Sequence, residues 1–536
     1  MVTEMSTIDQ AIFFMPMKIL QKFTVLGLFL VSCRQPAYNS SGEPIADSTI
    51  RHGRVLASRH CQSCHALPDP ALLNKDTWEK GVLPAMGPRL GIFHYKGRRY
   101  PSYIFDPYVG SGFYPSRPLI AGWEWQEIID YYSGMSPDSM PPQPLHEAIH
   151  DGSALFEARE VRDGYQPITC YVHVDTAGGR HQILAGRVLP GVLSRYDRRL
   201  RKQDSLLFPG GIVDMQIGDT AGVACDIGNI NPNNGRFGNA YRIHFDREGR
   251  MRMDSVPFLR DLARPVQVTA ADLNGDGRTD YVVCEFGNVK GALSWMEARG
   301  GGEYVRHVLR AQPGAIKAYV QDVNKDGRMD IWALFAQGEE GIFLFTNKGQ
   351  GRFEEREVLR FPPEYGSSSF QLADINGDGY PDIVYTCGDN ADYSVVLKPY
   401  HGVYIFLNDG DNHFYKKFFY PMNGCYKAIA RDFDGDGDID LAVIAYFADY
   451  RRHPEEGFVY LENQGGMVFR PYSVPAARRG RWLTMDAGDV DGDGRAELVL
   501  GNFSAGPTLS KDTVDWKKGP TLLLLKLLRR EKRKDN

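Results

Sequence analysis

Residues 272–280 read DLNGDGRTD, and this stretch is the first of five segments that share one pattern. The pattern is D-x-[DN]-x-D-G-x-x-[DE], and the other copies occupy residues 322–330, 374–382, 432–440 and 489–497. Successive copies begin 50, 52, 58 and 57 residues apart. A period of this length is typical of propellers and of other arrays of repeated units.

Each copy places oxygen-bearing side chains at alternate positions, where they can converge on one hard cation. Glycine at the sixth position permits a sharp turn, and the seventh residue can offer its backbone carbonyl. An EF-hand is excluded, because the first copy has Val283 where a bidentate glutamate is needed. One copy alone could be a solvated turn, but five in register predict calcium at about five sites. The candidate ligands are Asp272, Asn274, Asp276, Asp280, Asp322, Asn324, Asp326, Asp330, Asp374, Asn376, Asp378, Asp382, Asp432, Asp434, Asp436, Asp440, Asp489, Asp491, Asp493 and Glu497.

The sequence around each copy predicts four short strands. A strand such as 370–373 (FQLA) precedes the loop, and one such as 382–385 (DIVY) follows it. A third strand, such as 341–345 (GIFLF), and a fourth, such as 352–358 (RFEEREV), complete the unit. Four short strands per repeat make one propeller blade. These units resemble FG-GAP or VCBS repeats, the blades of integrin α-subunit propellers and of many secreted bacterial proteins. The resemblance implies an all-β propeller with a calcium loop between the first and second strands of a blade.

The number of units predicts seven blades and the way in which the ring closes. Two weaker units, at 168–204 and from Ile212 onward, keep the strand pattern without the acidic residues. Residues 155–161 (LFEAREV) nearly copy the fourth strand at 352–358, whereas the last unit ends at its third strand, 521–525. We therefore expect the strand at 155–161 to complete the last blade and to leave no unpaired edge.

A second informative segment precedes the repeats. Residues 61–65 read CQSCH, the spacing at which a c-type haem is attached through Cys61 and Cys64. The next residue, His65, then falls beneath the iron as the proximal ligand. The alternatives are a redox-active C-x-x-C or half of a zinc site. The sequence has no second C-x-x-C or His-x-His pair and no thioredoxin-like pattern around the motif, so haem c is favoured.

The residues around this motif predict two helices, at 47–59 and 123–132, with Gly53 where the second could cross the first closely. Between them lies a proline- and glycine-bounded loop, 83–89, that contains Met86. Residues 45–140 resemble a small, all-α c-type cytochrome, and this resemblance implies Met86 as the sixth iron ligand. His94 is the competing candidate.

The N-terminus predicts export. Residues 17–22 (MKILQK) form a charged region, and residues 23–31 form an apolar stretch too short to cross a bilayer. Residues 30–33 (LVSC) resemble a bacterial lipobox, which implies lipidation of Cys33. The alternative is an ordinary signal peptide with an incidental cysteine. Arg34 follows without an acidic cluster, so the resemblance implies a periplasm-facing lipoprotein of the outer membrane.

The chain is therefore predicted to be multidomain, a small all-α cytochrome followed by an all-β propeller. The expected divisions are a signal peptide at 1–32 (with Met17 as a possible true start), a lipidated tether at 33–46, a cytochrome domain at 47–135, a proline-rich linker at 136–153, a propeller at 154–528 and a basic tail at 529–536.

Several loops that follow the predicted second strands carry acidic and amide residues. They begin at Cys225, Cys284, Cys387 and Gly501, and they are expected on the face opposite the calcium loops, near the channel. They are candidates for binding a ligand, a metal or a partner, and recurrent turn chemistry explains them equally well. The cysteines among them are expected to be buried small apolar residues.

These features predict an exported electron-transfer lipoprotein with one covalent haem c. Iron held by His65 and Met86 has no open position, which suits electron transfer to a periplasmic redox partner or from a small-molecule donor. The alternatives are a haem-dependent dehydrogenase with its active site in the propeller channel, and an adhesion or scaffold protein. The sequence contains no recognisable catalytic set, and a net charge of −5 without a basic stripe argues against nucleic acid as a partner.

Overall fold

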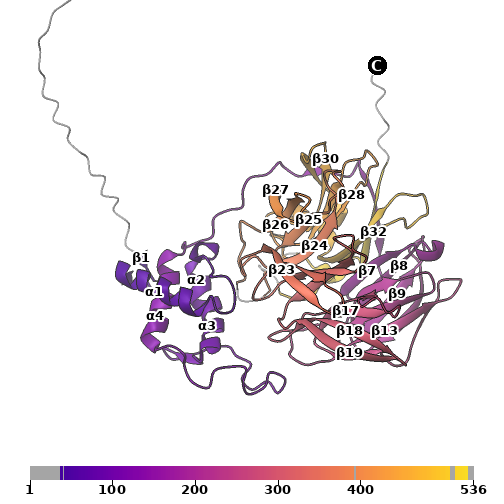
Figure 1. The fold of residues 1–536 in the computed structure, drawn as a ribbon. Coiled ribbons are helices and arrows are strands. Elements are labelled where there is room, and N and C mark those ends of the chain that lie inside the picture. Colours follow the sequence, from indigo (N-terminus) through magenta and orange to yellow (C-terminus); the bar gives the residue numbers. More distant parts are fainter. Residues whose placement is uncertain (1–36, 40, 392–393, 508–513, 529–536) are drawn as a thin grey trace, which may run out of the picture. The chain divides into compact units, whose positions relative to one another are not determined.

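The computed structural model describes residues 37–39, 41–391, 394–507 and 514–528, drawn in colour in Figure 1. The chain divides into two units, Met1–Pro36 and Ala37–Asn536, and the described residues belong to the second. The predicted signal peptide, Cys33 and the basic tail lie outside the described residues.

The first part of the described chain is a helical segment, coloured indigo to violet in Figure 1. Its two long helices are α1 (Asp47–His60) and α4 (Gly122–Met135), as predicted. They cross at Gly53, where an added Cβ would lie 2.0 Å from the backbone oxygen of Glu127. Any side chain at residue 53 would therefore push the helices apart. Leu56 and Ala57 of α1 and Trp125 and Ile128 of α4 are buried in the core that the helices share.

Short elements fill the space between the two helices. They are α2 (Lys75–Thr77), a π-helical turn (Trp78–Val82), α3 (Leu83–Met86) and a 3-10 turn (Gly87–Leu90). Two small hairpins accompany them, β1 (Ala37–Tyr38) with β2 (Pro44–Ile45) and β3 (His94–Tyr95) with β4 (Arg98–Arg99). The prediction of a loop around Met86 is therefore wrong, because Leu83–Leu90 form consecutive helical turns; Pro84 and Pro88 each occupy a first turn, where proline is tolerated.

The rest of the chain forms a seven-bladed β-propeller, as predicted, and its blades follow the sequence in order. Blade 1 consists of β7 (Thr169–Asp175), β8 (Gln182–Arg187), β9 (Gly191–Tyr196) and β10 (Lys202–Phe208). Blade 2 consists of β11 (Ile212–Ile217), β12 (Ala221–Asp226), β13 (Gly238–Phe245), β14 (Met251–Met253) and β15 (Leu259–Leu262). Blade 3 consists of β16 (Pro265–Ala271), β17 (Asp280–Glu285), β18 (Ala292–Gly300) and β19 (Glu303–Arg310). Blade 4 consists of β20 (Ala315–Gln321), β21 (Asp330–Phe335), β22 (Gly341–Asn347) and β23 (Phe353–Arg360).

The last three blades complete the ring. Blade 5 consists of β24 (Ser367–Ala373), β25 (Asp382–Cys387), β26 (Gly402–Asn408) and β27 (Phe414–Pro421). Blade 6 consists of β28 (Cys425–Arg431), β29 (Asp440–Ala445), β30 (Phe458–Asn463) and β31 (Phe469–Ser473), with β5 (His150–Asp151) parallel to β31. Blade 7 consists of β32 (Trp482–Gly488), β33 (Glu497–Asn502), β34 (Leu522–Leu527) and β6 (Phe156–Val161). The pairing of β6 with β34, from Leu522 opposite Val161 to Leu527 opposite Phe156, confirms the predicted closure.

The first strand of each blade contacts the first strand of the next blade around the whole ring. Polar side chains on these strands join neighbouring blades. The amide of Gln267 donates to the carbonyl of Ala318 at 3.1 Å and accepts from its N–H at 2.7 Å, and Gln371 does the same with Ala430. Since buried backbone groups need partners, these amides fix one blade against the next.

Candidate functional sites

The C-x-x-C-H motif forms the turn that directly follows α1. The N–H of Cys61 donates to the carbonyl of Ala57 at 2.8 Å, so the helical hydrogen bonding continues into the motif. Both cysteines have free thiols; Cys64 is exposed, and Cys61 is half-buried against the helical core. Nδ1 of His65 lies 2.7 Å from the carbonyl oxygen of Ala66. If Nδ1 carries the proton, it donates to this oxygen and Nε2 is left as the ligating nitrogen.

These residues fit a covalently attached haem. The donor set is two unpaired thiols on one helical turn and an imidazole oriented by a backbone carbonyl. Burial, together with the neighbouring Cys64, raises the pKa of the Cys61 thiol to about 11. A redox-active C-x-x-C needs a lowered cysteine pKa, so this shift argues against that alternative. Among the described residues, neither cysteine belongs to a group of three or more His, Cys, Asp or Glu side chains with metal-binding proximity.

The two candidates for the sixth ligand occupy different surroundings. Met86 is the last residue of α3 and is half-buried, outside the contiguous apolar core of the helical segment. His94 is exposed on β3. A half-buried thioether beside a helical core suits an axial ligand better than an exposed imidazole on a surface hairpin. The choice of Met86 stays a prediction.

Each of the five acidic loops lies between the first and second strands of its blade, in blades 3 to 7, as predicted. The first carboxylate of a loop is turned inward; that of Asp272 accepts from the N–H groups of Gly275 at 2.8 Å and Gly277 at 2.9 Å. The sixth residue has a positive φ in every loop, from 79° at Gly277 to 101° at Gly437. This conformation favours glycine, which explains the fixed glycine of the pattern.

The last carboxylate of each loop is buried. The exposed fraction is 0% for Asp280, Asp330 and Asp382 and 1% for Asp440 and Glu497. Each accepts from a backbone N–H at the second position of its own loop, as Asp280 does from Leu273 at 3.2 Å. The first four also accept from an N–H on the third strand of the blade. Burial raises the pKa of all five groups, and it raises that of Asp440 to about 7.

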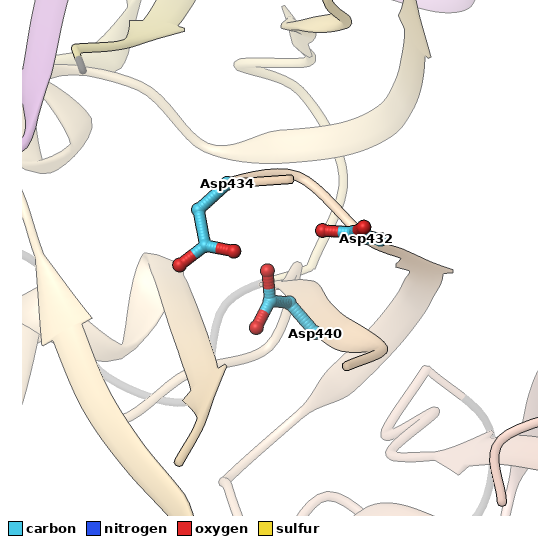
Figure 2. Close-up of side chains that lie close together, drawn as sticks. All are labelled: Asp432, Asp434 and Asp440. Atoms are coloured by element: carbon cyan, nitrogen blue, oxygen red, sulfur yellow. The ribbon is translucent and has the colours of Figure 1, made fainter. Parts of the chain in front are cut away.

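In the fourth loop, the side chains of Asp432, Asp434 and Asp440 point toward one another (Figure 2). One oxygen of each lies within 4.8 Å of the others. Burial raises the pKa of Asp434, and the charges of Asp436, Glu462 and Asp432 raise it further. Such crowding of carboxylates is unfavourable unless a cation or protons compensate it. Asp489, Asp491 and Asp493 form a second group of this kind in the fifth loop.

The loops that follow the second strands of blades 2, 3 and 5 contact the helical segment. Nδ2 of Asn234 donates to Oδ2 of Asp106 at 2.8 Å, and Nζ of Lys290 donates to the carbonyl of Val109. The hydroxyl of Tyr400 donates to the carbonyl of Leu72 at 2.8 Å. These loops therefore bind the helical segment of the same chain, and their sequence does not indicate this partner.

The glutamate and the cysteines at the start of these loops are buried inside the propeller. Glu285 is fully buried and forms ion pairs with Arg306 at 2.6 Å and Arg236 at 3.2 Å. Cys225, Cys284 and Cys387 are fully buried with free thiols, as predicted. Burial raises the pKa of the Cys284 thiol to about 12, as expected of an inert residue.

Sequence reasoning missed the residues on the third strands that face the acidic loops. Lys526 of β34 is the clearest case, because its ammonium group contacts three carboxylates of the fifth loop. It lies at the end of a leucine run and 29 residues after Glu497. Only the register of β33 and β34 brings it to the loop.

Comparison with known proteins identifies the repeats. A family model for FG-GAP-like repeats matches residues 272–333, 322–385 and 432–500, which include all five acidic loops. The chain therefore contains FG-GAP-like repeats in blades 3 to 7. Integrin alpha-PS3 of Drosophila melanogaster is 30% identical over 193 residues, which cover 30% of this chain and 16% of that protein. Integrin alpha-PS5 of the same species is 31% identical over 179 residues, 28% of this chain and 18% of that protein. The chain thus spans less than a fifth of the length of these relatives.

Solved structures similar to the chain include Sqt1 of Saccharomyces cerevisiae and a streptogramin B lyase. Sqt1 has a TM-score of 0.41 and 8% identity, over 69% of this chain and 98% of that chain. The lyase has a TM-score of 0.40 and 11% identity, over 70% of this chain and 100% of that chain. Within the described part of the chain, none of the helices has the length and apolar character needed to cross a membrane.

Proposed function

We propose that this protein is an exported electron-transfer protein that carries one covalent haem c and uses its propeller to dock a redox partner. The observation that carries the proposal is the arrangement at the end of α1. This helix crosses α4 at Gly53 and continues directly into two free thiols and a histidine whose Nδ1 faces a carbonyl.

The residues of the helical segment have distinct roles in this proposal. Cys61 and Cys64 would hold the haem through thioether bonds, and His65 would bind its iron through Nε2. Met86 would supply a thioether ligand to the same iron. Haem ligated in this way accepts and donates single electrons. The carbonyl of Ala66 orients the imidazole, and the packing of α1 against α4 fixes the helix that leads into the motif.

The proposal extends to the location and the ions of the protein. Residues 17–33 would direct export and lipidation at Cys33, which places the protein at a membrane facing the periplasm. The partner would be a periplasmic redox protein or a small-molecule donor. Calcium in most of the acidic loops would brace the blades by relieving the repulsion between carboxylates.

The test is expression of the full chain together with a haem c maturation system. We expect a covalent haem that survives denaturing electrophoresis and gives a pyridine haemochrome spectrum. Replacing both Cys61 and Cys64 with serine should abolish it, whereas Cys170→Ser, at a buried cysteine of the propeller, should not. If the wild-type chain folds without covalent haem under these conditions, the proposal is wrong.

The sixth ligand has a separate test. Met86→Ala should remove any sulfur-to-iron absorption band and lower the reduction potential, because a thioether ligand raises the potential. A spectrum that changes with His94→Ala and not with Met86→Ala would assign the site to His94.

An adhesion or scaffold role is the second candidate. It is supported by the FG-GAP-like repeats and by the similarity of this region to two integrin α chains. A chain that attaches haem and is reduced by a periplasmic donor supports electron transfer. A chain that attaches none, yet binds cells or a matrix protein in a calcium-dependent way, supports adhesion.

A further inference from the structure

The five acidic loops differ at one position of the third strand. The last carboxylate of each loop begins the second strand of its blade, and the residue after it pairs with a residue of the third strand. In blades 3 to 7 these third-strand partners are Met296, Phe345, Phe406, Leu461 and Leu525. The residue that follows the partner on the third strand therefore lies beside the buried carboxylate. In chain order these residues are Glu297, Thr346, Leu407, Glu462 and Lys526. The position is acidic in two blades, uncharged in two and basic in blade 7.

The side chain at this position reaches the loop. Oε1 of Glu297 accepts from the Asn274 amide at 3.3 Å, so in blade 3 it adds a carboxylate to the first loop. In blade 6 the residue at the same position, Glu462, is also a carboxylate.

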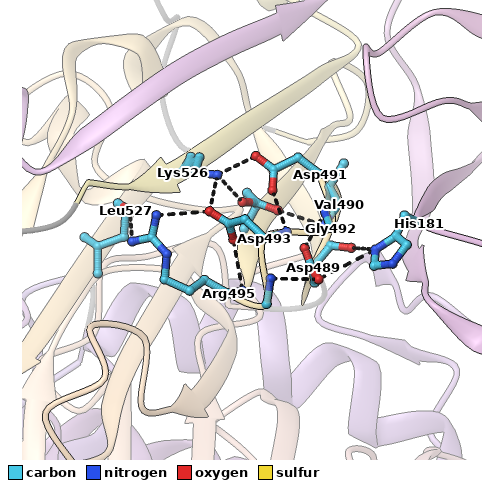
Figure 3. A network of polar contacts seen from close by, with 11 residues as sticks. His181, Asp489, Val490, Asp491, Gly492, Asp493, Arg495, Lys526 and Leu527 are labelled. Atoms are coloured by element: carbon cyan, nitrogen blue, oxygen red, sulfur yellow. Dashed lines mark hydrogen bonds and ion pairs between the residues drawn. The ribbon is translucent and has the colours of Figure 1, made fainter. Parts of the chain in front are cut away.

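In blade 7 the same position brings a permanent cation into the loop (Figure 3). Nζ of Lys526 lies 2.7 Å from Oδ2 of Asp493 and 3.3 Å from Oε1 of Glu497, and it forms an ion pair with Asp491. The Lys526 side chain is 19% exposed. The ammonium group donates to Asp491 and Asp493, and Glu497 adds a third carboxylate within ion-pair distance.

This arrangement does not fit a divalent cation. Calcium in the fifth loop would need the oxygens of Asp491 and Asp493, and these already contact Nζ. Two cations among the same oxygens would repel each other strongly.

We propose that Lys526 is the built-in cation of the fifth loop and that its ammonium group takes the place of a divalent ion there. Lys526 lies opposite Glu157 of β6 in the backbone pairing that closes the ring. The proposed cation of the fifth loop is therefore covalently part of the blade that joins the two ends of the propeller. The contrast with the other four loops rests on the proposed binding of calcium to them.

The test counts the calcium ions bound by the full chain at equilibrium. Lys526→Met removes the ammonium group, and Lys526→Glu installs the residue found at this position in blades 3 and 6. Both should bind one more ion than the wild type, and Lys526→Arg should bind the wild-type number. Lys518→Met is the matched control, because it removes the same charge from a side chain that is 85% exposed and paired with Asp515.

A thermal melt gives a second readout. In chelator, Lys526→Met should melt below the wild type, and added calcium should return most of the difference. The proposal is overturned if both variants bind the same number of ions as the wild type, whatever that number is. A wild type without ions and a Lys526→Glu variant with one would uphold the role of Lys526 and refute calcium in the other loops. The haemochrome spectrum should be the same in every variant, so failure of the haem proposal is distinguishable.

Discussion

The helical segment and the propeller build their candidate sites in different ways. The helical segment places two thiols and a histidine within five consecutive residues, and one close contact at Gly53 holds the helices that carry them. The propeller repeats one loop five times, and the third strand of the same blade faces each loop. The first site is local in sequence, and its helix crossing leaves room only for glycine at residue 53. The second depends on strand register and is distributed over many contacts.

The two regions should therefore respond to different perturbations. A change at the helix crossing should damage the helical segment and leave the ring of blades intact. Removing cations should weaken several blades at once and leave the C-x-x-C-H turn unchanged. Four predictions test this contrast, from the largest expected effect to the smallest.

Removal of calcium should have the largest effect, and it should act on the propeller alone. A cation bound only by the folded loop contributes about 2.7 kcal/mol per site at a hundredfold excess over its dissociation constant. With several sites, chelation should lower the melting temperature of the propeller substantially. The measurement is thermal melting with calcium and with chelator, followed by far-ultraviolet circular dichroism and by haem absorbance. If chelator leaves the melting temperature of the propeller unchanged, calcium binding to these loops does not stabilise the fold.

The second prediction concerns the helix crossing. Gly53→Leu places side-chain atoms where the Glu127 carbonyl lies, so it should destabilise the helical segment by about 3 kcal/mol. We expect loss of haem attachment, with the β-sheet signal and calcium-dependent melt of the propeller retained. Gly112→Leu is the control, because an added Cβ at Gly112 meets no atom within 4 Å. Normal haem attachment in Gly53→Leu would contradict the close crossing.

The third prediction concerns pH and a carboxyl where the two regions meet. Glu364 adjoins Tyr365, whose ring stacks on that of Tyr400 at 4.6 Å, and Tyr400 binds the carbonyl of Leu72. Burial raises the pKa of Glu364 from 4.5 to about 8. Folding therefore favours its protonated form, so the associated stability is present below pH 4.5 and is lost as the pH rises through 8.

Glu364→Gln cannot ionise and should escape this loss. Its gain in unfolding free energy over the wild type should increase between pH 5 and 8 by on the order of 1 kcal/mol per pH unit, and then level off. Chemical denaturation at a series of pH values measures the difference. Glu357→Gln, at a more exposed side chain of β23, should show no such trend. If the difference in unfolding free energy between Glu364→Gln and the wild type does not change with pH, the raised pKa of Glu364 is refuted.

The smallest effect is expected at a contact between two blades. Gln267→Leu would leave the N–H and carbonyl of Ala318 without their side-chain partner, which should cost roughly 2 kcal/mol. Gln203→Leu, on the exposed side of blade 1, should change the unfolding free energy by less than about 0.5 kcal/mol. Urea denaturation compares them. Equal values for the two variants would mean that the inter-blade amide contributes nothing measurable.

Much of the architecture could be predicted because its signals are local. The acidic loop at 272–280, the strands around it and its period were enough for seven blades, and the duplicate of the fourth strand at 155–161 predicted the closure by β6. Gly53 indicated the helix crossing, because only glycine allows so close an approach. A loop was predicted around Met86, but the structure has short helical turns there. Proline and glycine occur at the ends of short helical turns as well as in loops, so they do not distinguish the two.

The sequence by itself therefore determined the order of the regions, the number of blades and the place of each acidic loop, since hydrophobic period and turn chemistry act over short stretches of chain. The tertiary structure alone decided which side chain completes each loop and what the opposite loops hold. Lys526 meets Asp493 through the register of β33 and β34, and Tyr400 meets Leu72 across 328 residues of sequence. Such contacts depend on how separate strands align and on which surfaces pack together, and no local pattern encodes either.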